Sequence, residues 1–131
     1  MLPRLVMPRK DSVLRVKSEM YADRIVRLYR FLEQQGEKVM SQQIYRSGTS
    51  IGANVAESIN AQSGADFISK LSIALKEANE TAYWLERLYH SDRIDEKGFQ
   101  SLNSDNEELI KMLVSSIKTM KRNMNINPSS Q

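Results

Sequence analysis

Cysteine is absent from this sequence of 131 residues. The chain can therefore form no disulfide, bind no metal through thiolates and use no cysteine nucleophile, which is typical of a protein in the reducing cytoplasm. Long apolar runs are also lacking. No run approaches the roughly 18 residues that a transmembrane helix needs, and residues 1–10 contain no apolar stretch of signal-peptide length. We therefore expect a cytoplasmic protein with no membrane partner.

Proline is scarce: it occurs at Pro3, Pro8 and Pro128, so residues 9–127 contain none. Proline is the strongest helix breaker, and the apolar residues of this span recur at three- and four-residue steps without strand-like alternation. Apolar residues make up 40% of the chain and charged residues 27%, which is a globular rather than a disordered composition. The length suits one domain. The fold class is therefore predicted to be all-α.

Four helices are predicted in this span. The second covers residues 38–62, the third begins near residue 63 and the fourth near residue 95, and these short connections favour an antiparallel up-down-up-down four-helix bundle. We assign residues 1–17 to a basic N-terminal arm or helix start, residues 18–122 to the bundle and residues 123–131 to a polar C-terminal tail. The stripe of the first helix consists of Tyr21, Ile25, Leu28 and Leu32, with Ser12 or Ser18 as its cap.

Capping signals mark the later helices. Ser63 and Asp66 form the S-x-x-D pattern of a capping box, and Asp95 is typical of an N-cap, with Ile94 and Phe99 as a hydrophobic staple. The residues expected on the buried face of the second helix are Ile44, Gly48, Ile51, Val55 and Ile59.

Histidine is nearly as scarce as cysteine, since His90 is the only one. Carboxylate bundles that bind two metal ions need a Glu-x-x-His pair on each of two helices. His90 instead falls at the end of the third predicted helix. Without a histidine or cysteine inside the bundle, acid–base and nucleophilic catalysis lack their usual residues. We expect neither a metal site, a cofactor nor a catalytic residue.

Glycine interrupts the second predicted helix twice, at Gly48 and Gly52. Each glycine inside a helix costs up to about 1 kcal/mol relative to alanine, so a compensating interaction is expected. Close approach by a neighbouring helix is the favoured interpretation. A phosphate-binding loop is the alternative, but no strand precedes these residues and no G-K-[ST] follows them.

Two rows of polar side chains share helix faces. We consider two interpretations: the rows face each other in a buried hydrogen-bonded network, or both are solvated surfaces. Either interpretation gives these residues a structural role. The first row consists of Arg46, Ser50, Asn54 and Glu57, and the second of Lys70, Glu77 and Thr81, with Glu80 beside it.

Charge is distributed unevenly although the net charge is only +3. Residues 1–30 and 109–131 are basic, and residues 31–108 are acidic. In an up-down-up-down bundle the two basic ends lie at the same pole, where they would form a phosphate-binding surface. Two interpretations compete with this one: lysines that stabilise a helix dipole, and loose basic termini, which are common. The candidate nucleic-acid-binding residues are Arg9, Lys10, Arg15, Lys17, Lys118, Lys121 and Arg122.

Two blocks of the sequence resemble a known family. They are residues 46–57, RSGTSIGANVAE, and residues 66–85, DFISKLSIALKEANETAYWL. They are similar to bacterial four-helix-bundle proteins encoded in intervening sequences of large-subunit ribosomal RNA, a family that includes the accessory variability protein of diversity-generating retroelements. The positions that match the family patterns are Arg46, Ser47, Ser50, Ile51, Asn54, Glu57, Lys76, Glu77, Ala78, Glu80 and Thr81.

The resemblance implies an antiparallel bundle that assembles into a homopentameric ring. For the retroelement branch it also implies a basic surface that contacts nucleic acid and a reverse transcriptase as partner. Those accessory proteins are strongly basic, whereas this chain is not. The leading hypothesis is a non-enzymatic homo-oligomer that binds RNA or DNA backbones. The alternative is a protein-binding adaptor or scaffold without a nucleic-acid role.

Overall fold

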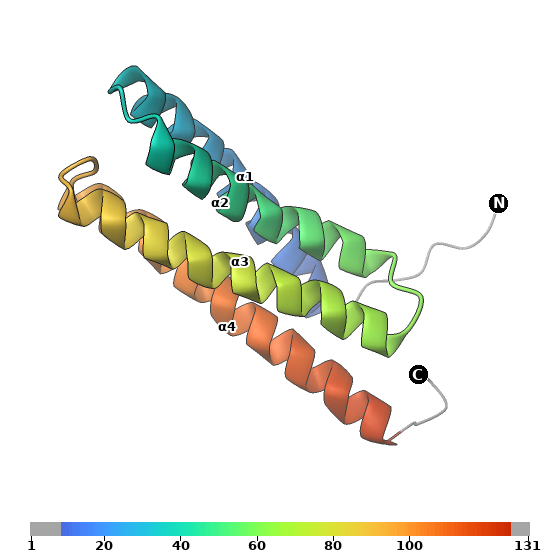
Figure 1. Ribbon diagram of the computed structural model, residues 1–131. Coiled ribbons are helices and arrows are strands. Elements are labelled where there is room, and N and C mark those ends of the chain that lie inside the picture. The colour runs from blue at the N-terminus through green and yellow to red at the C-terminus, as the bar shows by residue number, and fades with distance from the viewer. Residues whose placement is uncertain (1–8, 127–131) are drawn as a thin grey trace.

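The computed structural model describes the backbone of residues 9–126 and the side chains of residues 11–125. This part of the chain is all-helical, with four helices joined by short connections (Figure 1). Among the described residues, no helix is both long and apolar enough to cross a membrane. The helices are α1 (Arg9–Gln34), α2 (Val39–Ile59), α3 (Gly64–His90) and α4 (Glu96–Ile126).

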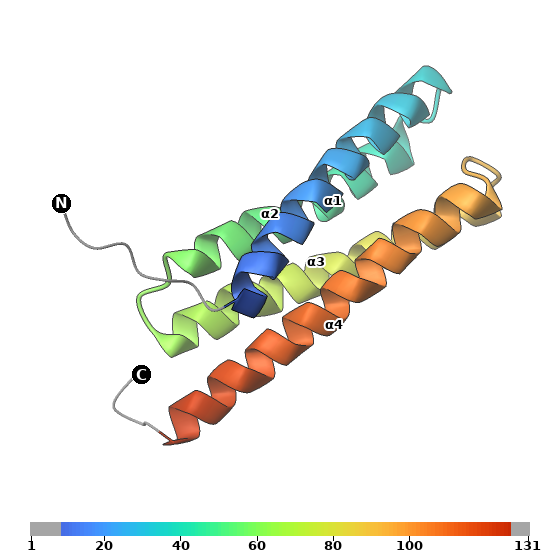
Figure 2. The same cartoon turned by 180° about the vertical axis from the view of Figure 1, so that it is seen from behind.

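The connections alternate between the two ends of the bundle. The α1–α2 and α3–α4 connections lie at one end, here called the turn end (Figure 1). The α2–α3 connection lies at the other end, together with the start of α1 and the end of α4, as both views show (Figures 1 and 2). We call this second end the terminal end. Each helix packs against two others, in the cyclic order α1, α2, α3, α4.

The core is formed by the apolar stripes that the sequence predicts. Tyr21, Ile25 and Leu32 of α1 are at most 2% exposed, and the predicted stripe of α2 is buried as far as Val55. Ile59 differs, because it is 42% exposed in the last turn of α2. The prediction that Ile59 belongs to the buried face is therefore wrong, and the reason is that α2 ends at this residue and the chain turns away at Asn60.

Close packing of α1 and α2 explains the two glycines. A Cβ atom on Gly48 would lie 2.7 Å from Cγ1 of Ile25, and one on Gly52 would lie 3.1 Å from the carbonyl oxygen of Ser18. A larger residue at either position would thus collide with α1. The favoured interpretation, close approach by a neighbouring helix, is confirmed.

The predicted caps of α3 and α4 are present. The Ser63 hydroxyl accepts a hydrogen bond of 3.0 Å from the Asp66 backbone N–H, and Asp95 Oδ1 accepts one of 2.7 Å from the Gly98 N–H. These bonds satisfy donors that a helix start otherwise leaves unpaired.

The start of α1 lies earlier than the cap on Ser18 would allow. The helix begins at Arg9, and the Ser18 hydroxyl donates to the Arg15 carbonyl 2.9 Å away inside the helix. Ser18 is therefore not a cap. Leu14 is 1% exposed, so packing into the core stabilises the helix upstream of that position. The boundaries drawn at residues 17 and 122 fall inside α1 and α4.

Candidate nucleic-acid interface

The start of α1 and the end of α4 lie at the terminal end of the bundle. The Ser116 hydroxyl of α4 donates a hydrogen bond of 3.1 Å to Asp11 Oδ1 near the start of α1. Figure 2 shows the start of α1 and the last turns of α4 at this end. The side chains of Arg9 and Lys10 lie outside the described residues.

The two remaining candidates on α1 are engaged in ion pairs. Arg15 Nη1 lies 3.1 Å from Glu19 Oε1 within the same helix, and the Lys17 ammonium pairs with Glu108 of α4. A carboxylate beside each cation weakens its attraction for a phosphate. These two residues therefore contribute less to a phosphate-binding surface than their number suggests.

The three candidates on α4 have a different environment. Lys118 and Arg122 line a shallow depression on the outer face of α4, and Lys121 lies outside this lining. Within the described part of the chain, no ion pair or hydrogen bond engages Lys118, Lys121 or Arg122. Residues 109–126 of α4 also contain no acidic residue. Their charges are thus available to an anionic ligand.

Lys111, which is not among the predicted candidates, extends this group. Lys111 lines the same depression as Lys118 and Arg122, together with Ile110 and Val114. The sequence alone could have predicted this position. Residues 111, 118 and 122 are separated by seven and four positions and therefore share one helix face. We define Lys111, Lys118, Lys121 and Arg122 as the α4 basic face.

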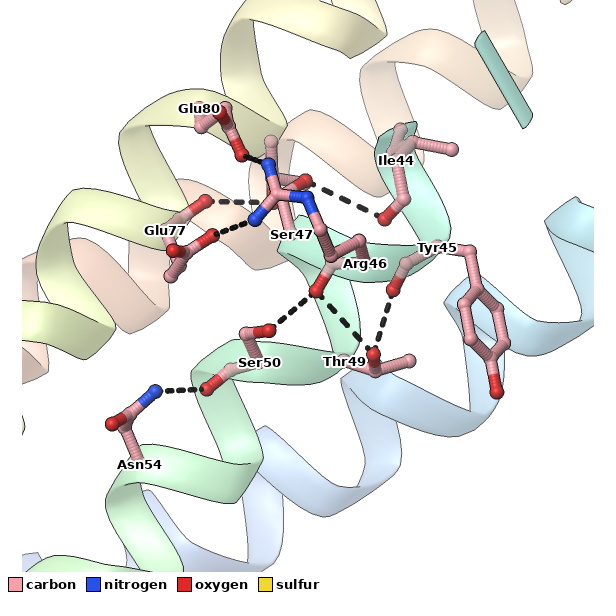
Figure 3. Close-up of polar contacts among 10 residues, drawn as sticks. Ile44, Tyr45, Arg46, Ser47, Thr49, Ser50, Asn54, Glu77 and Glu80 are labelled. Carbon is pink, nitrogen blue, oxygen red and sulfur yellow. Dashed lines mark hydrogen bonds and ion pairs between the residues drawn. The ribbon is translucent and has the colours of Figure 1, made fainter. Parts of the chain in front are cut away.

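The two polar rows do face each other across α2 and α3. Arg46 reaches from α2 to Glu77, with Nη1 3.3 Å from Oε2, and also pairs with Glu80 (Figure 3). Further along, Lys70 Nζ lies 3.1 Å from Glu57 Oε2, and this partner raises the pKa of Lys70 above its usual value. The Arg46 side chain is 51% exposed. The rows therefore form a surface seam of ion pairs.

Two members of the first row bond to their own helix. The Ser50 hydroxyl donates to the Arg46 carbonyl 2.6 Å away, and the Asn54 amide donates to the Ser50 carbonyl 2.9 Å away (Figure 3). The two rows face each other across α2 and α3, as the first interpretation predicted. They lie at the surface and not in a buried network, as the second interpretation predicted.

One buried pair lies beneath the seam. The hydroxyls of Ser47 and Thr81 are 2.9 Å apart, and Thr81 also donates to the Glu77 carbonyl at 2.8 Å. Both side chains are fully buried. These hydrogen bonds satisfy polar groups that would otherwise be costly inside the bundle. Arg46, Ser47, Glu77, Glu80 and Thr81 thus join α2 to α3.

A metal centre has no support in the described residues, where no group of three or more His, Asp or Glu residues could hold an ion. His90 is exposed at the last position of α3, with its ring 5.5 Å from the ring of Tyr89. The α4 basic face is therefore the strongest candidate site in this part of the chain.

Comparison with known proteins gives two matches. Residues 10–115 match the protein family described as 23S rRNA-intervening sequence protein. Among solved structures, the chain is similar to a protein with unknown function from the S23 ribosomal protein family of Bacteroides thetaiotaomicron. The two sequences are 57% identical over 83% of this chain and 98% of that one, with a TM-score of 0.82. No curated protein matches this sequence.

Proposed function

Because the chain belongs to the family of 23S rRNA-intervening sequence proteins, as its two sequence blocks predicted, we propose that it is a non-enzymatic bundle that binds the backbone of RNA or DNA. Its copies assemble into a homo-oligomer, a pentameric ring of antiparallel bundles, in the cytoplasm. The contact to nucleic acid is made through the α4 basic face. The ring multiplies this face and so raises the local positive potential.

The observation that supports this proposal is that the candidate cations Arg15 and Lys17 of α1 are paired with carboxylates, whereas the candidate cations of α4 are not, within the described residues. Lys17 is paired with Glu108, whereas Lys118 and Arg122 share an outer face of α4 that has no acidic residue from position 109 onward. Unpaired lysine and arginine side chains on one face can replace the counterions of a phosphate backbone. This arrangement recognises the negative charge of the phosphates rather than base sequence.

Salt titration tests the proposal directly. Binding of the full chain to mixed-sequence RNA and DNA is measured at several salt concentrations. We expect affinity to fall steeply with salt, with a log–log slope of about −0.9 for each duplex phosphate contact. If no binding is detected even at low salt, the proposal is wrong and the protein-binding adaptor becomes the better hypothesis.

A triple variant locates the contact. Replacing Lys118, Lys121 and Arg122 with glutamine removes three positive charges, so we expect weaker binding and a shallower salt slope. The matched control replaces Lys38, Arg87 and Lys97, three exposed cations at the turn end, with glutamine. If both variants lose the same affinity, net charge rather than the α4 basic face determines binding.

The oligomer is tested on the same proteins. Light scattering after size-exclusion chromatography should give five times the mass of the chain for the wild type and for both triple variants. A monomeric wild type would contradict the ring. Loss of assembly in the α4 variant alone would mean that these residues belong to a subunit interface. A reverse-transcriptase partner, which the resemblance also implies, is tested by co-purification with that enzyme.

A further inference from the structure

Two tyrosines meet on the outer side of α1 and α2, apart from the core. The centroids of the Tyr29 and Tyr45 rings lie 4.9 Å apart, and the ring planes are tilted by 52°. Neither tyrosine belongs to the core or to the partly buried residues packed against it. Tyr45 is 42% exposed, and Figure 3 shows its side chain directed away from Glu77 and Glu80. Tyr45 therefore presents aromatic surface that the described part of the chain leaves partly uncovered.

The two tyrosines line an open depression of about 350 Å³ on α1 and α2. Val26 and Arg30 of α1 and Gln42 of α2 complete the lining, so no carboxylate among the described residues lines it. We call this depression, lined by these five residues, the tyrosine site. Small-ligand sites usually have volumes of about 300–1,000 Å³. An aromatic surface beside an arginine and an amide suits a flat ring with polar edges, because the ring can stack while its edges form hydrogen bonds.

Arg30 gives the tyrosine site a positive charge. Its side chain is exposed, and within the described residues no ion pair or hydrogen bond engages Arg30 or Gln42. Glu33, three residues further along α1, already bonds to Ser41 and pairs with Lys38. The charge of Arg30 is therefore available to a phosphate, and the Gln42 amide can both donate and accept hydrogen bonds.

We propose that the tyrosine site binds an unpaired base of single-stranded RNA or DNA. The base stacks on Tyr45, Arg30 contacts the adjacent phosphate, and Gln42 bonds to the edge of the base. Every base has an aromatic face, so the site tolerates any sequence. In a duplex the bases are paired and stacked on one another, whereas the bases of a single strand are free to stack on an aromatic side chain.

This inference rests on the proposed nucleic-acid binding and deepens it. The α4 basic face recognises phosphates, which single and double strands share. The tyrosine site adds a contact that only an unpaired base can make. It therefore assigns to the protein a class of nucleic acid, the single strand.

Affinity measurements on single strands and a duplex test the tyrosine site. The full-length wild type and Tyr45→Ala are titrated with a mixed-sequence single-stranded RNA, the corresponding DNA strand and the RNA duplex, all at the same low salt concentration. Loss of one stacked base should weaken binding to both single strands about tenfold and leave binding to the duplex unchanged. Tyr45→Phe keeps the ring and should bind like the wild type.

Tyr83→Ala is the matched control. Tyr83 of α3 is 54% exposed, and the Arg87 guanidinium lies 5.6 Å from its ring centroid. It thus also combines an exposed aromatic ring with an arginine, but it does not line the tyrosine site. We expect Tyr83→Ala to keep the affinity of the wild type for single strands. Circular dichroism verifies that all variants are folded.

A crosslinking experiment gives a second measurement that needs no substitution. A single-stranded RNA that carries iodouracil is irradiated with the wild-type protein, and the modified tryptic peptides are identified by mass spectrometry. A base stacked on a tyrosine crosslinks to it. We expect the crosslink in the peptide of residues 39–46, in which Tyr45 is the only aromatic residue.

The outcomes distinguish this inference from the proposed function. If the wild type binds neither single strands nor the duplex, nucleic-acid binding itself is wrong, and the tyrosine site is wrong with it. If the α4 triple variant loses affinity but Tyr45→Ala does not, only the tyrosine site is wrong. Equal losses in Tyr45→Ala and Tyr83→Ala, or equal losses for single strands and duplex, would also overturn it. A changed oligomer mass in Tyr45→Ala would mean that another subunit, rather than a base, covers the tyrosines.

Discussion

Helix α2 and the second half of α4 use their residues for different purposes. On α2, Gly48 and Gly52 pack against α1, and Ser47 bonds to Thr81 of α3. On α4, the four side chains of the basic face are exposed. The family match ends at residue 115, before three of the four residues of that face. The pattern by which the family is recognised thus describes packing, and the surface proposed to bind nucleic acid lies mostly beyond it.

The largest effect should come from filling the α1–α2 contact. In Gly48→Leu the new side chain meets Ile25, which is fully buried, so the core must shift to admit it. We expect a loss of about 3 kcal/mol in the free energy of unfolding, the cost of overpacking a core. Urea denaturation followed by circular dichroism measures it. Ala53→Leu, at an exposed position of the same helix, serves as control. Equal stability of the two variants would refute the close approach.

The buried bond between α2 and α3 should give the next largest effect. Thr81→Val removes the hydroxyl that lies 2.9 Å from that of Ser47. We expect a loss of about 1–2 kcal/mol, because the Ser47 hydroxyl stays buried without this partner. Combining it with Ser47→Ala should cost less than the sum of the two single changes. Strict additivity in this double-mutant cycle would show that the hydroxyls do not interact.

A smaller effect is expected where α1 meets α4. The Tyr21 hydroxyl donates a hydrogen bond of 3.0 Å to the Leu102 carbonyl, and burial raises the pKa of Tyr21 above its usual range. Tyr21→Phe should cost about 1 kcal/mol at pH 7. Unfolding titrations at pH 7 to 11 measure both this loss and its pH dependence.

The sign of the pH dependence follows from the raised pKa of Tyr21. The folded protein keeps the tyrosine proton, whereas the unfolded chain releases it above about pH 10. The contribution of Tyr21 to the free energy of unfolding is therefore fully present below this pH and declines as the pH rises above it. Tyr21→Phe should remove this part of the decline. If both proteins lose the same stability between pH 9 and 11, another group is responsible.

The smallest effect should come from the surface seam. Arg46→Gln removes the partner of Glu77 and Glu80, but the arginine side chain is half exposed. We expect a loss of about 0.5 kcal/mol that shrinks at high salt. Arg30→Gln, an exposed arginine on α1, provides the reference. A loss above that of Thr81→Val would make the ion pairs, rather than the buried hydroxyls, the main link between α2 and α3.

Local signals in the sequence predicted the helices well. The caps at Ser63 and Asp95 and the glycine contacts of α2 are present where the residue types indicated. Each of these signals depends on neighbours within one turn or on one helix face. The end of α2 was misjudged at Ile59, because an apolar residue in the last turn has the same periodicity whether or not a neighbouring helix covers it.

The candidate site was predicted only in part. The order of the helices predicted that the site lies at one pole, and Lys118, Lys121 and Arg122 were among the predicted residues. The pairing of Lys17 with Glu108 joins residues 91 positions apart, and no local pattern predicts such a contact. Lys111 lies farther from the C-terminus than the other three cations, and only the helical period of α4 places it on their face.

By itself, the sequence determined that this chain forms four helices, which face of each is apolar and to which family it belongs. Helical periodicity and capping are local properties, so they can be read along the chain. Only the tertiary structure decided which cations stay unpaired and which apolar side chains stay exposed. Both depend on the rotation and height of each helix relative to its neighbours, which are set by side-chain packing across the whole bundle.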